Sequence, residues 1–385
     1  MFSSRVPADR EPNRIARALS VARSSGRPLI DLTVTNPTMA GIDYPSGLLQ
    51  PLASPLALQY SPQPFGLEAA RCAVVRDYSR RGIAVAQDHV VLTASTSEAY
   101  SLLFKLLCHP EGDDVLVPVP SYPLFDHLTE LDGVHARPYA LEYQGRWTLD
   151  VASVDRAWTA GVRAVLAVSP NNPTGSFLGS DELALLSDRC AARDAALIID
   201  EVFADYPISA AMAADVPETC LTFRLGGLSK SIGLPQIKLA WIAVSGPPAL
   251  VVEALNRLEL IADTYLSVST PVQVAAGALL EAGVAVRAKI LERIRANDGQ
   301  LRNLARGFPS IEVLPAEAGW SAVVRVPSRM PEEDLVVELI EQDGVSVHPG
   351  FFFDFPHEAF LVISLLPEPA TFADGVRRAL ERAGA

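Results

Sequence analysis

The chain has 385 residues, 49% of them hydrophobic and 20% charged, which is enough apolar material for one large globular domain with a smaller domain beside it. Its formal net charge of -13 argues against nucleic acid or an anionic membrane surface as the main partner, because both carry negative charge themselves. The apolar runs are too short to span a bilayer, and four scattered cysteines without C-x-x-C spacing fit neither a zinc site nor a disulfide scaffold, so we expect free thiols, no metal and a cytoplasmic protein.

Helical and strand patterns alternate through most of the chain. An amphipathic helix is predicted near the N-terminus, at residues 13–26. The further helices predicted by apolar periodicity are 66–82, 96–108 and 180–194. The predicted strands are 89–93, 114–119, 163–169, 195–200, 222–225 and 238–245. This alternation predicts an α/β fold in which helices cover both faces of a mostly parallel sheet.

The last third of the chain follows another pattern. Two long helices are predicted at 248–263 and 272–305, and strands at 321–327 and 360–366 then flank a helix at 331–342. We interpret this tail as a smaller α+β unit. In open α/β sheets ligands bind at the carboxyl ends of the strands, so the residues that directly follow each strand of the large sheet are the candidates for a functional site.

Hydroxyl side chains follow the first of these strands. Ser95, Thr96 and Ser97 lie where the strand 89–93 turns into a helix, and free backbone N–H groups at a helix start attract an anion. The alternative is a simple helix cap, in which a hydroxyl accepts a hydrogen bond from the first turn.

Two proline-bracketed turns follow other strands. Asn172 lies in "SPNNPTG" (169–175), where its amide can donate a hydrogen bond, and Tyr122 lies in "PSYPLF" (120–125), where a rigidly held ring can stack on a flat ligand. The alternatives are an ordinary turn for the first and a packed turn tyrosine for the second.

A carboxylate lies at the end of the strand 195–200, and an amine follows the strand 222–225 after four residues. Asp200 follows a run of apolar residues, and a charge beside a buried crevice needs a cationic partner unless it caps a helix or faces solvent. Lys230 follows Gly226 and Gly227, which permit a close approach of the backbone, and a desolvated lysine becomes a nucleophile towards aldehydes. Since the chain has only four lysines, a surface role for this one is less expected than usual.

These groups describe one ligand. It carries a phosphate, a flat ring, a ring nitrogen that pairs with an anion, a ring oxygen that accepts a hydrogen bond, and an aldehyde that reacts with an amine. Pyridoxal 5'-phosphate has all five, and a carboxylate against its pyridine nitrogen lets the ring withdraw electrons from the neighbouring carbon.

The order and spacing of "PSYPLF", "SPNNPTG", "DEVF" and "LSKSIGLP" resemble the class I/II aminotransferases, which are fold-type I pyridoxal-phosphate enzymes. The resemblance runs from residue 32 to residue 366. It implies a mostly parallel seven-stranded central sheet with helices on both faces, and a large domain at 40–275 that packs against a small domain made of 1–39 and 276–385. It also implies transfer of an amino group from an amino acid or amine to an oxo acid through a pyridoxamine intermediate.

The resemblance assigns roles to individual residues. Lys230 holds the cofactor as a Schiff base and moves the proton, Asp200 pairs with the pyridine nitrogen, and Asn172 bonds the ring oxygen. Tyr122 stacks on the ring. The residues implied around the phosphate are Ser95, Thr96, Ser97, Ser229 and Lys238, together with Tyr60. Because the family tyrosine at the position of Tyr60 reaches the neighbouring subunit, the resemblance implies a homodimer with shared active sites.

Five positions depart from the family pattern. Phe203 replaces a tyrosine that bonds the ring oxygen, a bond that Tyr206 could replace. Gly227 stands where the family often has a serine, Lys238 stands where it has an arginine, and Thr35 stands where it often has a glycine.

The most consequential departure is Val362, which occupies the position of the arginine that binds the substrate carboxylate. Phe351 and Phe352 belong to an aromatic run nearby. Arg325 is not an obvious replacement for the arginine, because its side chain can point outward from its strand. Thr35, Val362, Phe351 and Phe352 are therefore the candidates for the substrate pocket. Either carboxylate recognition has moved to another residue, or the substrate has an apolar group, or no carboxylate, near Val362.

Two other functions fit the same residues less well. The fold also supports β-lyases and decarboxylases, which share the early chemical steps. A non-catalytic effector-binding domain is the other alternative, but such regulators carry a basic DNA-binding module, which this acidic chain lacks.

Overall fold

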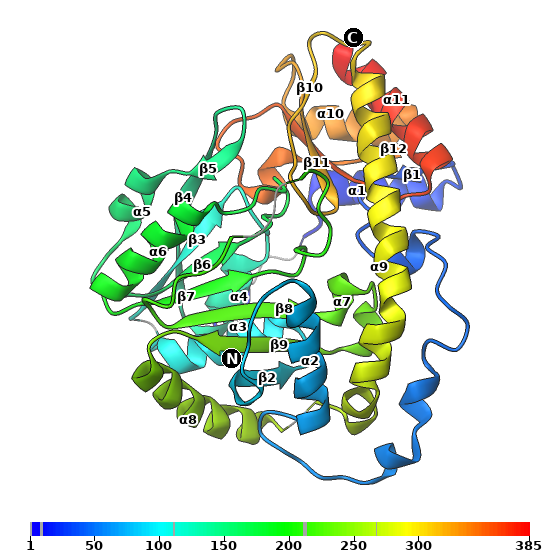
Figure 1. The fold of residues 1–385 in the computed structure, drawn as a ribbon. Coiled ribbons are helices and arrows are strands. Elements are labelled where there is room, and N and C mark those ends of the chain that lie inside the picture. Colours follow the sequence, from blue (N-terminus) through cyan, green and yellow to red (C-terminus); the bar gives the residue numbers. More distant parts are fainter. Residues whose placement is uncertain (1, 8–10, 111, 211–213, 267) are drawn as a thin grey trace.

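The computed structural model describes residues 2–7, 11–110, 112–210, 214–266 and 268–385. A large central sheet dominates the structure (Figure 1). Its strands, in spatial order, are β2 (Val90–Thr93), β9 (Ala240–Ser245), β8 (Thr222–Gly227), β7 (Ala196–Asp200), β6 (Val162–Val168), β3 (Asp114–Val119), β4 (His135–Tyr143) and β5 (Trp147–Leu149).

Strand direction gathers the carboxyl ends at one edge. Only β9 and β5 run antiparallel to their neighbours within this sheet, as the structure describes it; β2, β8, β7, β6, β3 and β4 share one direction. The mostly parallel α/β fold is thus confirmed, with eight strands instead of the seven expected. The additional strand β5 is a short hairpin partner of β4, held there by contact between the rings of Tyr143 and Trp147, 5.4 Å apart.

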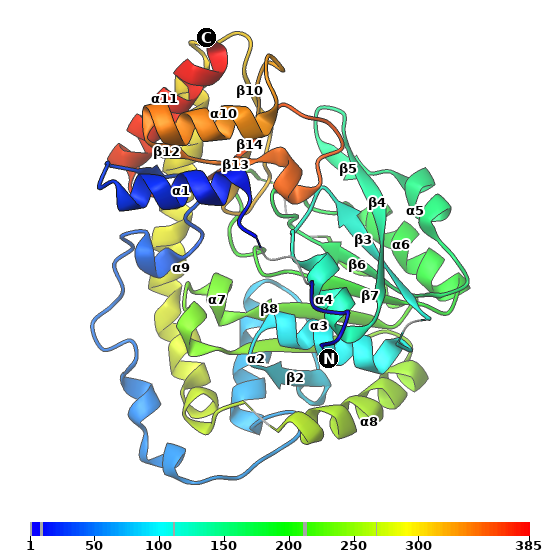
Figure 2. The same ribbon diagram turned by 180° about the vertical axis from the view of Figure 1, so that it is seen from behind.

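Helices cover both faces of this sheet (Figures 1 and 2). Alternate residues of each strand point to opposite faces, so that Val115 and Val117 pack on one side and Leu116 on the other. The helices on the first side are α3 (Thr96–Leu107), α4 (Phe125–Asp132) and α8 (Pro248–Tyr265). Those on the second side are α2 (Glu68–Arg80), α5 (Val151–Ala157) and α6 (Ser180–Ala192).

The N-terminal segment and the C-terminal part of the chain form a second layer, which lies next to the edge of the large sheet where its parallel strands end. Its four-stranded sheet has the order β10 (Glu312–Val313), β11 (Ser321–Arg325), β14 (Phe360–Ser364) and β13 (His348–Pro349). The accompanying helices are α1 (Arg14–Ser24), α10 (Glu332–Glu338) and α11 (Pro369–Gly384).

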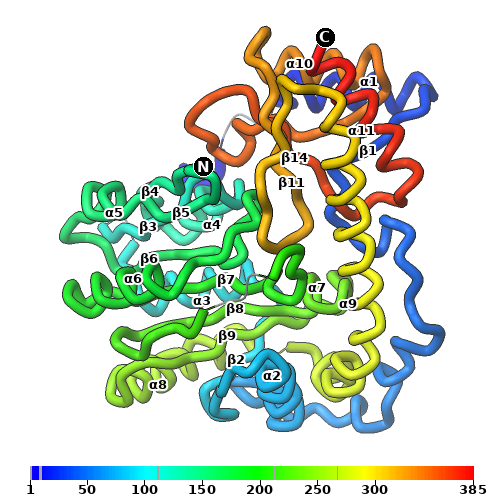
Figure 3. Tube along the Cα trace, turned by 45° about the horizontal axis from the view of Figure 1, so that its top comes forward, coloured from blue at the N-terminus to red at the C-terminus, as the bar shows by residue number. Residues whose placement is uncertain are grey.

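A parallel strand pair joins the two ends of the chain. β1 (Ile30–Asp31) pairs with β12 (Val345–Ser346), and Figure 2 shows α1 lying against α10 on the same side. Helix α9 (Thr270–Ala305) has 36 residues and runs past both layers (Figure 3). The division into 40–275 and the paired segments 1–39 and 276–385 stays a prediction, which this pairing supports.

Short elements complete the fold. They are α7 (Leu228–Ser231), a π-helical turn (Leu339–Asp343) and 3-10 turns at Pro37–Met39, Gln50–Ala53, Pro55–Leu58, Gln87–His89, Pro235–Ile237 and Gly350–Phe353. Between residues 40 and 66 the chain runs as an open strap along the outside of α9 (Figure 1). Within the described residues, no helix has the length and apolar character needed to cross a bilayer.

Candidate active site

A cavity of about 260 Å³ lies at the carboxyl edge of the large sheet, under the second layer. Its lining residues that follow strands of the large sheet, or lie on α3, include Thr96, Ser97, Tyr100, Tyr122, Asn172, Asp200, Phe203, Ser229 and Lys230. Its lining residues from the second layer and the N-terminal segment are Thr33, Thr35, Trp320, Ser321, His348, Phe353, Val362 and Ser364. We call the first set the sheet wall and the second set the cap wall.

Lys230 projects into this cavity from α7, directly after β8. Its Nζ lies 5.0 Å from the centre of the Trp320 ring and 5.6 Å from that of Phe203. Burial lowers the pKa of Lys230, and the nearby Asp200 partly opposes this shift. The amine is therefore easier to deprotonate than a surface lysine, as a nucleophile towards an aldehyde must be.

The two glycines before Lys230 serve strand packing. A Cβ at Gly226 would come within 2.6 Å of the Trp241 indole nitrogen, and one at Gly227 within 2.9 Å of the Ala240 Cβ. The close approach expected from the sequence is thus to strand β9, which fixes where β8 delivers the lysine.

Asp200 lies at the carboxyl end of β7 and is buried, with 7% of its surface exposed. Tyr100 donates its phenol proton to Oδ2 at 2.7 Å, and the Val202 backbone N–H donates to Oδ1 at 3.0 Å. Burial nevertheless raises the pKa of Asp200 to about 6, because these two bonds and Lys230 only partly offset the desolvation. A cationic group placed beside it would relieve this cost.

Tyr206 does not supply the hydrogen bond that Phe203 lacks. Its hydroxyl donates to the backbone carbonyl of Lys230 at 2.6 Å and lies 3.1 Å from that of Ser231. Because Tyr206 is fully buried and does not line the cavity, it positions the lysine's backbone, and Phe203 leaves the cavity wall apolar at this point.

Asn172 is held in the cavity by the first residue of strand β11. Ser321 donates to its Oδ1 at 3.4 Å, which leaves the amide N–H₂ available to a ligand. The buried Asn171 beside it donates to the Pro120 carbonyl at 3.0 Å and accepts from Ser121 at 2.7 Å. Asn171, which sequence reasoning did not single out, thus ties the turn of Asn172 to that of Tyr122.

Tyr122 is half-buried at the cavity, with its ring edge-on to Phe125 at 5.6 Å. Burial raises its pKa, with a further contribution from the charge of Asp200. The aromatic face and the buried carboxylate therefore belong to one compartment of the cavity.

The predicted phosphate residues divide into two groups. Thr96, Ser97 and Ser229 line the cavity. Ser95 caps α3, since its hydroxyl accepts from the Glu98 N–H at 3.0 Å, which matches the simple cap considered above. A cofactor contact by Ser95 stays a prediction.

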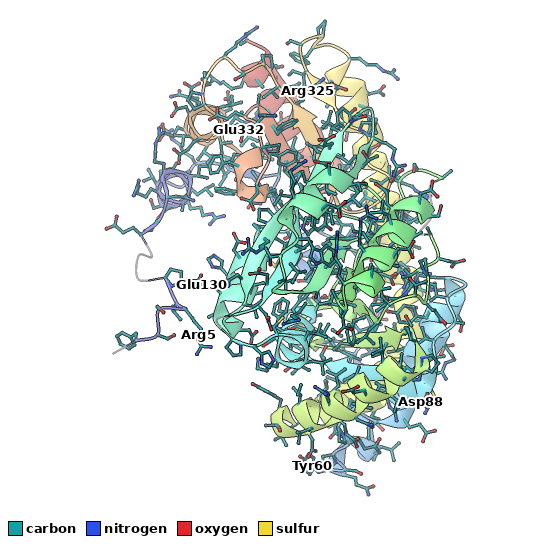
Figure 4. The ribbon with its side chains drawn as sticks, turned by 90° about the vertical axis from the view of Figure 1, so that its left-hand side faces the viewer. Arg5, Tyr60, Asp88, Glu130, Arg325 and Glu332 are labelled. Atoms are coloured by element: carbon teal, nitrogen blue, oxygen red, sulfur yellow. The ribbon has the colours of Figure 1, made fainter. Side chains whose placement is uncertain are left out.

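Other predicted residues lie outside the cavity lining. Lys238 is exposed, in a left-handed backbone conformation with φ of 56°. Tyr60 is 69% exposed on the strap, and Figure 4 shows it at the lower margin of the molecule. Phe351 is 43% exposed, and Phe352 packs between Phe351 and His348. Their roles at the site stay predictions.

The cap wall contains Thr35 and Val362, as predicted, but most of its members were not predicted. These are Thr33, Trp320, Ser321, His348, Phe353 and Ser364. They come from elements that long-range packing brings together. The aromatic run around residue 351 was the available signal, and Phe353 is the phenylalanine of that run that faces the cavity.

The sheet wall fits pyridoxal 5'-phosphate. A buried carboxylate with a raised pKa is suited to a pyridinium nitrogen, and the buried amine to the aldehyde carbon. The half-buried ring of Tyr122, the free amide of Asn172 and the hydroxyl cluster at the start of α3 supply the remaining contacts. Together they define an enzyme that uses this cofactor on a fold-type I scaffold.

The chain belongs to the class I and II aminotransferases, whose family description, "Aminotransferase class I and II", matches residues 50–378. It is a pyridoxal-phosphate-dependent enzyme that transfers amino groups between amino and oxo-acid substrates. Neither the family match nor the names of the relatives described next favour the β-lyase, decarboxylase or effector-binding alternatives.

Curated relatives and solved structures support this assignment. The chain is 26% identical over 378 residues to an alanine aminotransferase of Mycobacterium tuberculosis, covering 92% of this chain and 85% of that protein. It is 24% identical to a glutamate-pyruvate aminotransferase of Haemophilus influenzae, covering 95% and 91%. The alanine aminotransferase from Pyrococcus furiosus superposes with a TM-score of 0.88 at 21% identity, covering 99% of each chain, which establishes the shared fold.

Proposed function

We propose that Lys230 is the catalytic residue of the amino transfer and that Asp200 promotes the reaction by pairing with the ring nitrogen of the cofactor. The observation that supports this most is the pairing of a buried amine and a buried carboxylate in one cavity, at the ends of the adjacent strands β7 and β8. Pyridoxal 5'-phosphate, when bound, supplies the ring that accepts electrons from the substrate carbon.

The residues of this chain then divide the work at the cofactor between them. Lys230 binds the cofactor's aldehyde and afterwards moves a proton at the substrate carbon. Asp200 keeps the ring nitrogen protonated, with Tyr100 holding the carboxylate in place. Asn172 donates its amide hydrogen to the ring oxygen, and Tyr122 covers one face of the ring.

The phosphate is held by Thr96, Ser97 and Ser229, with Ser95 at the same helix start. Lys238 adds a positive charge where the family has arginine. As a point charge, an ammonium neutralises phosphate without the two-pronged geometry of a guanidinium.

We also propose a homodimer in which Tyr60 reaches the phosphate of the partner's site. The strap and the α8–α9 junction expose apolar side chains: Leu56, Leu58, Tyr60, Leu260, Tyr265 and Leu266. Leu56 and Thr270 line one groove, so these two regions are neighbours. An exposed apolar surface of this kind is typical of a subunit interface.

A cytoplasmic location completes the proposal. The four cysteines are free thiols, and three of them are buried. Such thiols are compatible with a reducing compartment.

The central experiment loads the purified protein with pyridoxal 5'-phosphate and offers single amino donors, including alanine, glutamate, aromatic amino acids and amines. We expect at least one donor to change the cofactor's visible absorbance and to yield its oxo product, and an oxo acid to reverse the change. If the cofactor binds but no donor reacts, or if ammonia or carbon dioxide appears instead, transamination is wrong.

The shared site is tested by mixing two variants, Lys230→Ala and Tyr60→Ala, each of which we expect to have lost most of its activity. In a mixed dimer, one site combines Lys230 of one subunit with Tyr60 of the other. Since half of the randomly formed dimers are mixed and each has one intact site, we expect roughly a quarter of wild-type activity to return. Recovery would not occur if Tyr60 served its own subunit.

A further inference from the structure

Val362 lies at the centre of the cap wall, between two other strands. It pairs with His348 of β13 on one side and with Val323 of β11 on the other. Directly paired residues of antiparallel strands point to the same face, so His348 and Val362 stand side by side, and both line the cavity. This is the part of the cavity where the family pattern places an arginine.

Among the described residues no arginine lines the cavity. Arg325 is exposed and ion-paired with Glu312, and Figure 4 shows it in the upper part of the molecule. Arg293 of α9 donates to the backbone carbonyls of Ala40 and Leu366, each at 3.0 Å, and does not reach the cavity lining.

The one titratable side chain in the described part of the cap wall is His348. Its ring packs against Phe352 and Phe353, each with ring centres 5.8 Å away. Burial lowers the pKa of His348, although the carboxylate of Asp31 partly opposes the shift. At neutral pH this imidazole therefore does not offer the permanent charge of a guanidinium.

The hydroxyls of this wall are largely committed to the protein. Ser364 donates to the Val34 carbonyl and accepts from the Leu366 N–H. Thr33 donates to the carboxylate of Asp31, which lies behind the wall and is also paired with Arg23 at 3.6 Å. Ser321 donates to the Asn172 Oδ1, so among the described hydroxyls of this wall Thr35 is the one left open to a ligand.

A carboxylate on the reacting carbon would thus meet an apolar valine, a histidine with a lowered pKa and the neutral hydroxyl of Thr35. Burying an ion without a cationic partner costs several kcal/mol, which single neutral donors do not recover. An uncharged substituent meets no such cost.

We propose that this enzyme acts on primary amines whose amino-bearing carbon carries no carboxylate, including amino acids in which several carbons separate the two groups. The proposal rests on the transamination proposed above and adds the substrate class. Over one cycle the donor exchanges its C–N bond for a C=O bond and becomes an aldehyde or ketone. An oxo acid whose carbonyl carbon likewise carries no carboxylate, because several carbons separate the two groups, exchanges its C=O for a C–N bond. No other oxidant or reductant is needed.

Matched donors test the proposal with the unmodified holoenzyme. Glutamate is 4-aminobutyrate with a carboxylate added to the reacting carbon, and phenylalanine is likewise 2-phenylethylamine with a carboxylate added. We expect kcat/KM at least tenfold higher for the donor without that carboxylate in at least one pair. Higher values for the α-amino acid in both pairs overturn the substrate class and leave transamination standing. No reaction with any donor overturns transamination, and the substrate class with it.

A variant and a binding measurement sharpen the result. Val362→Arg should shift the ratio at least tenfold towards the α-amino acid, whereas the uncharged size control Val362→Leu should keep the preference for amines. In calorimetry, the wild-type holoenzyme should bind 3-phenylpropan-1-ol more tightly than 3-phenylpropionate, and Val362→Arg should reverse this order. Tighter binding of the carboxylate by the wild type contradicts the proposal, even if the arginine variant fails to fold.

Discussion

The two walls of the cavity differ in charge and in origin. The sheet wall carries a buried ionisable pair, Asp200 and Lys230, at the ends of adjacent strands. The cap wall carries apolar and neutral side chains from segments as distant as residues 33 and 364. The sheet wall therefore supplies the groups that bind the cofactor and transfer protons, and the cap wall supplies the side chains that contact the substrate.

This difference implies that the two walls respond differently to change. A substitution in the sheet wall should alter the chemistry for every substrate, whereas one in the cap wall should alter the choice among substrates.

Replacing the lysine should have the largest effect. In Lys230→Ala we expect amino transfer to fall by at least about 10³-fold for all donors, because both the attachment of the cofactor and the proton transfer are lost. Stopped-flow absorbance with saturating donor measures this. Lys105→Ala is the control, since Lys105 bonds Ser101 and Asp132 on the surface and should leave the rate unchanged. A selective loss for one donor class would contradict the division between the walls.

The cofactor-free protein should lose stability as the pH rises from about 4 to about 6. Asp200 keeps its proton up to a pKa of about 6 in the folded state but only to 3.8 when unfolded, so the folded form binds more protons in this window. The loss amounts to about 3 kcal/mol and is complete above pH 6. Urea unfolding of wild type and Asp200→Asn across this window isolates the effect, because the asparagine variant should lack it. If the free energy of unfolding changed with pH in the same way in both proteins, the raised pKa of Asp200 would be contradicted.

Removing the hydroxyl of Tyr206 should have a smaller effect. Tyr206→Phe loses the bond to the Lys230 carbonyl, with a stability cost of about 1 kcal/mol. Because this bond positions the catalytic lysine, kcat should fall several-fold with little change in KM. Tyr44→Phe is the matched control: it loses a 2.6 Å bond to the Gly233 carbonyl and should reduce stability without the same loss in kcat. Equal kinetic effects would indicate a merely structural role.

The smallest expected effect is on a pKa. Phe203→Tyr adds a phenol to the cavity where the family has one, and it should lower the pH at which the cofactor bound to Lys230 titrates, by up to about one unit. Absorbance titration of the holoenzyme measures this pH. Phe353→Tyr adds a phenol to the cap wall and should not produce the shift. An unchanged titration in Phe203→Tyr would contradict the role assigned to the missing hydroxyl.

The sheet wall could be predicted because local patterns determine it. Each apolar strand ends at a recognisable residue, and parallel strands bring those ends to one edge, so Asp200, Asn172, Tyr122 and Lys230 were found from the sequence and meet in the cavity. Tyr100 was missed because it lies one helical turn inside α3, where its periodicity indicates only a buried position.

The cap wall could not be predicted in the same way. His348 lies beside Val362 only because a two-residue strand pairs there, and so short a strand has no pattern of its own. Strand β4 was missed for a related reason. It lies towards the edge of the sheet, and exposed residues such as His135 and Arg137 interrupt its alternation.

The pairing of β1 with β12 has a consequence for the order in which the enzyme is made. Ile30 leaves the ribosome more than three hundred residues before its partner Val345, so Thr33 and Thr35 cannot take their places in the cavity until almost the whole chain has been synthesised. The large sheet has no such dependence, because its last strand ends at Ser245. A nascent chain can therefore form the sheet that carries Lys230 well before the wall that selects its substrate exists.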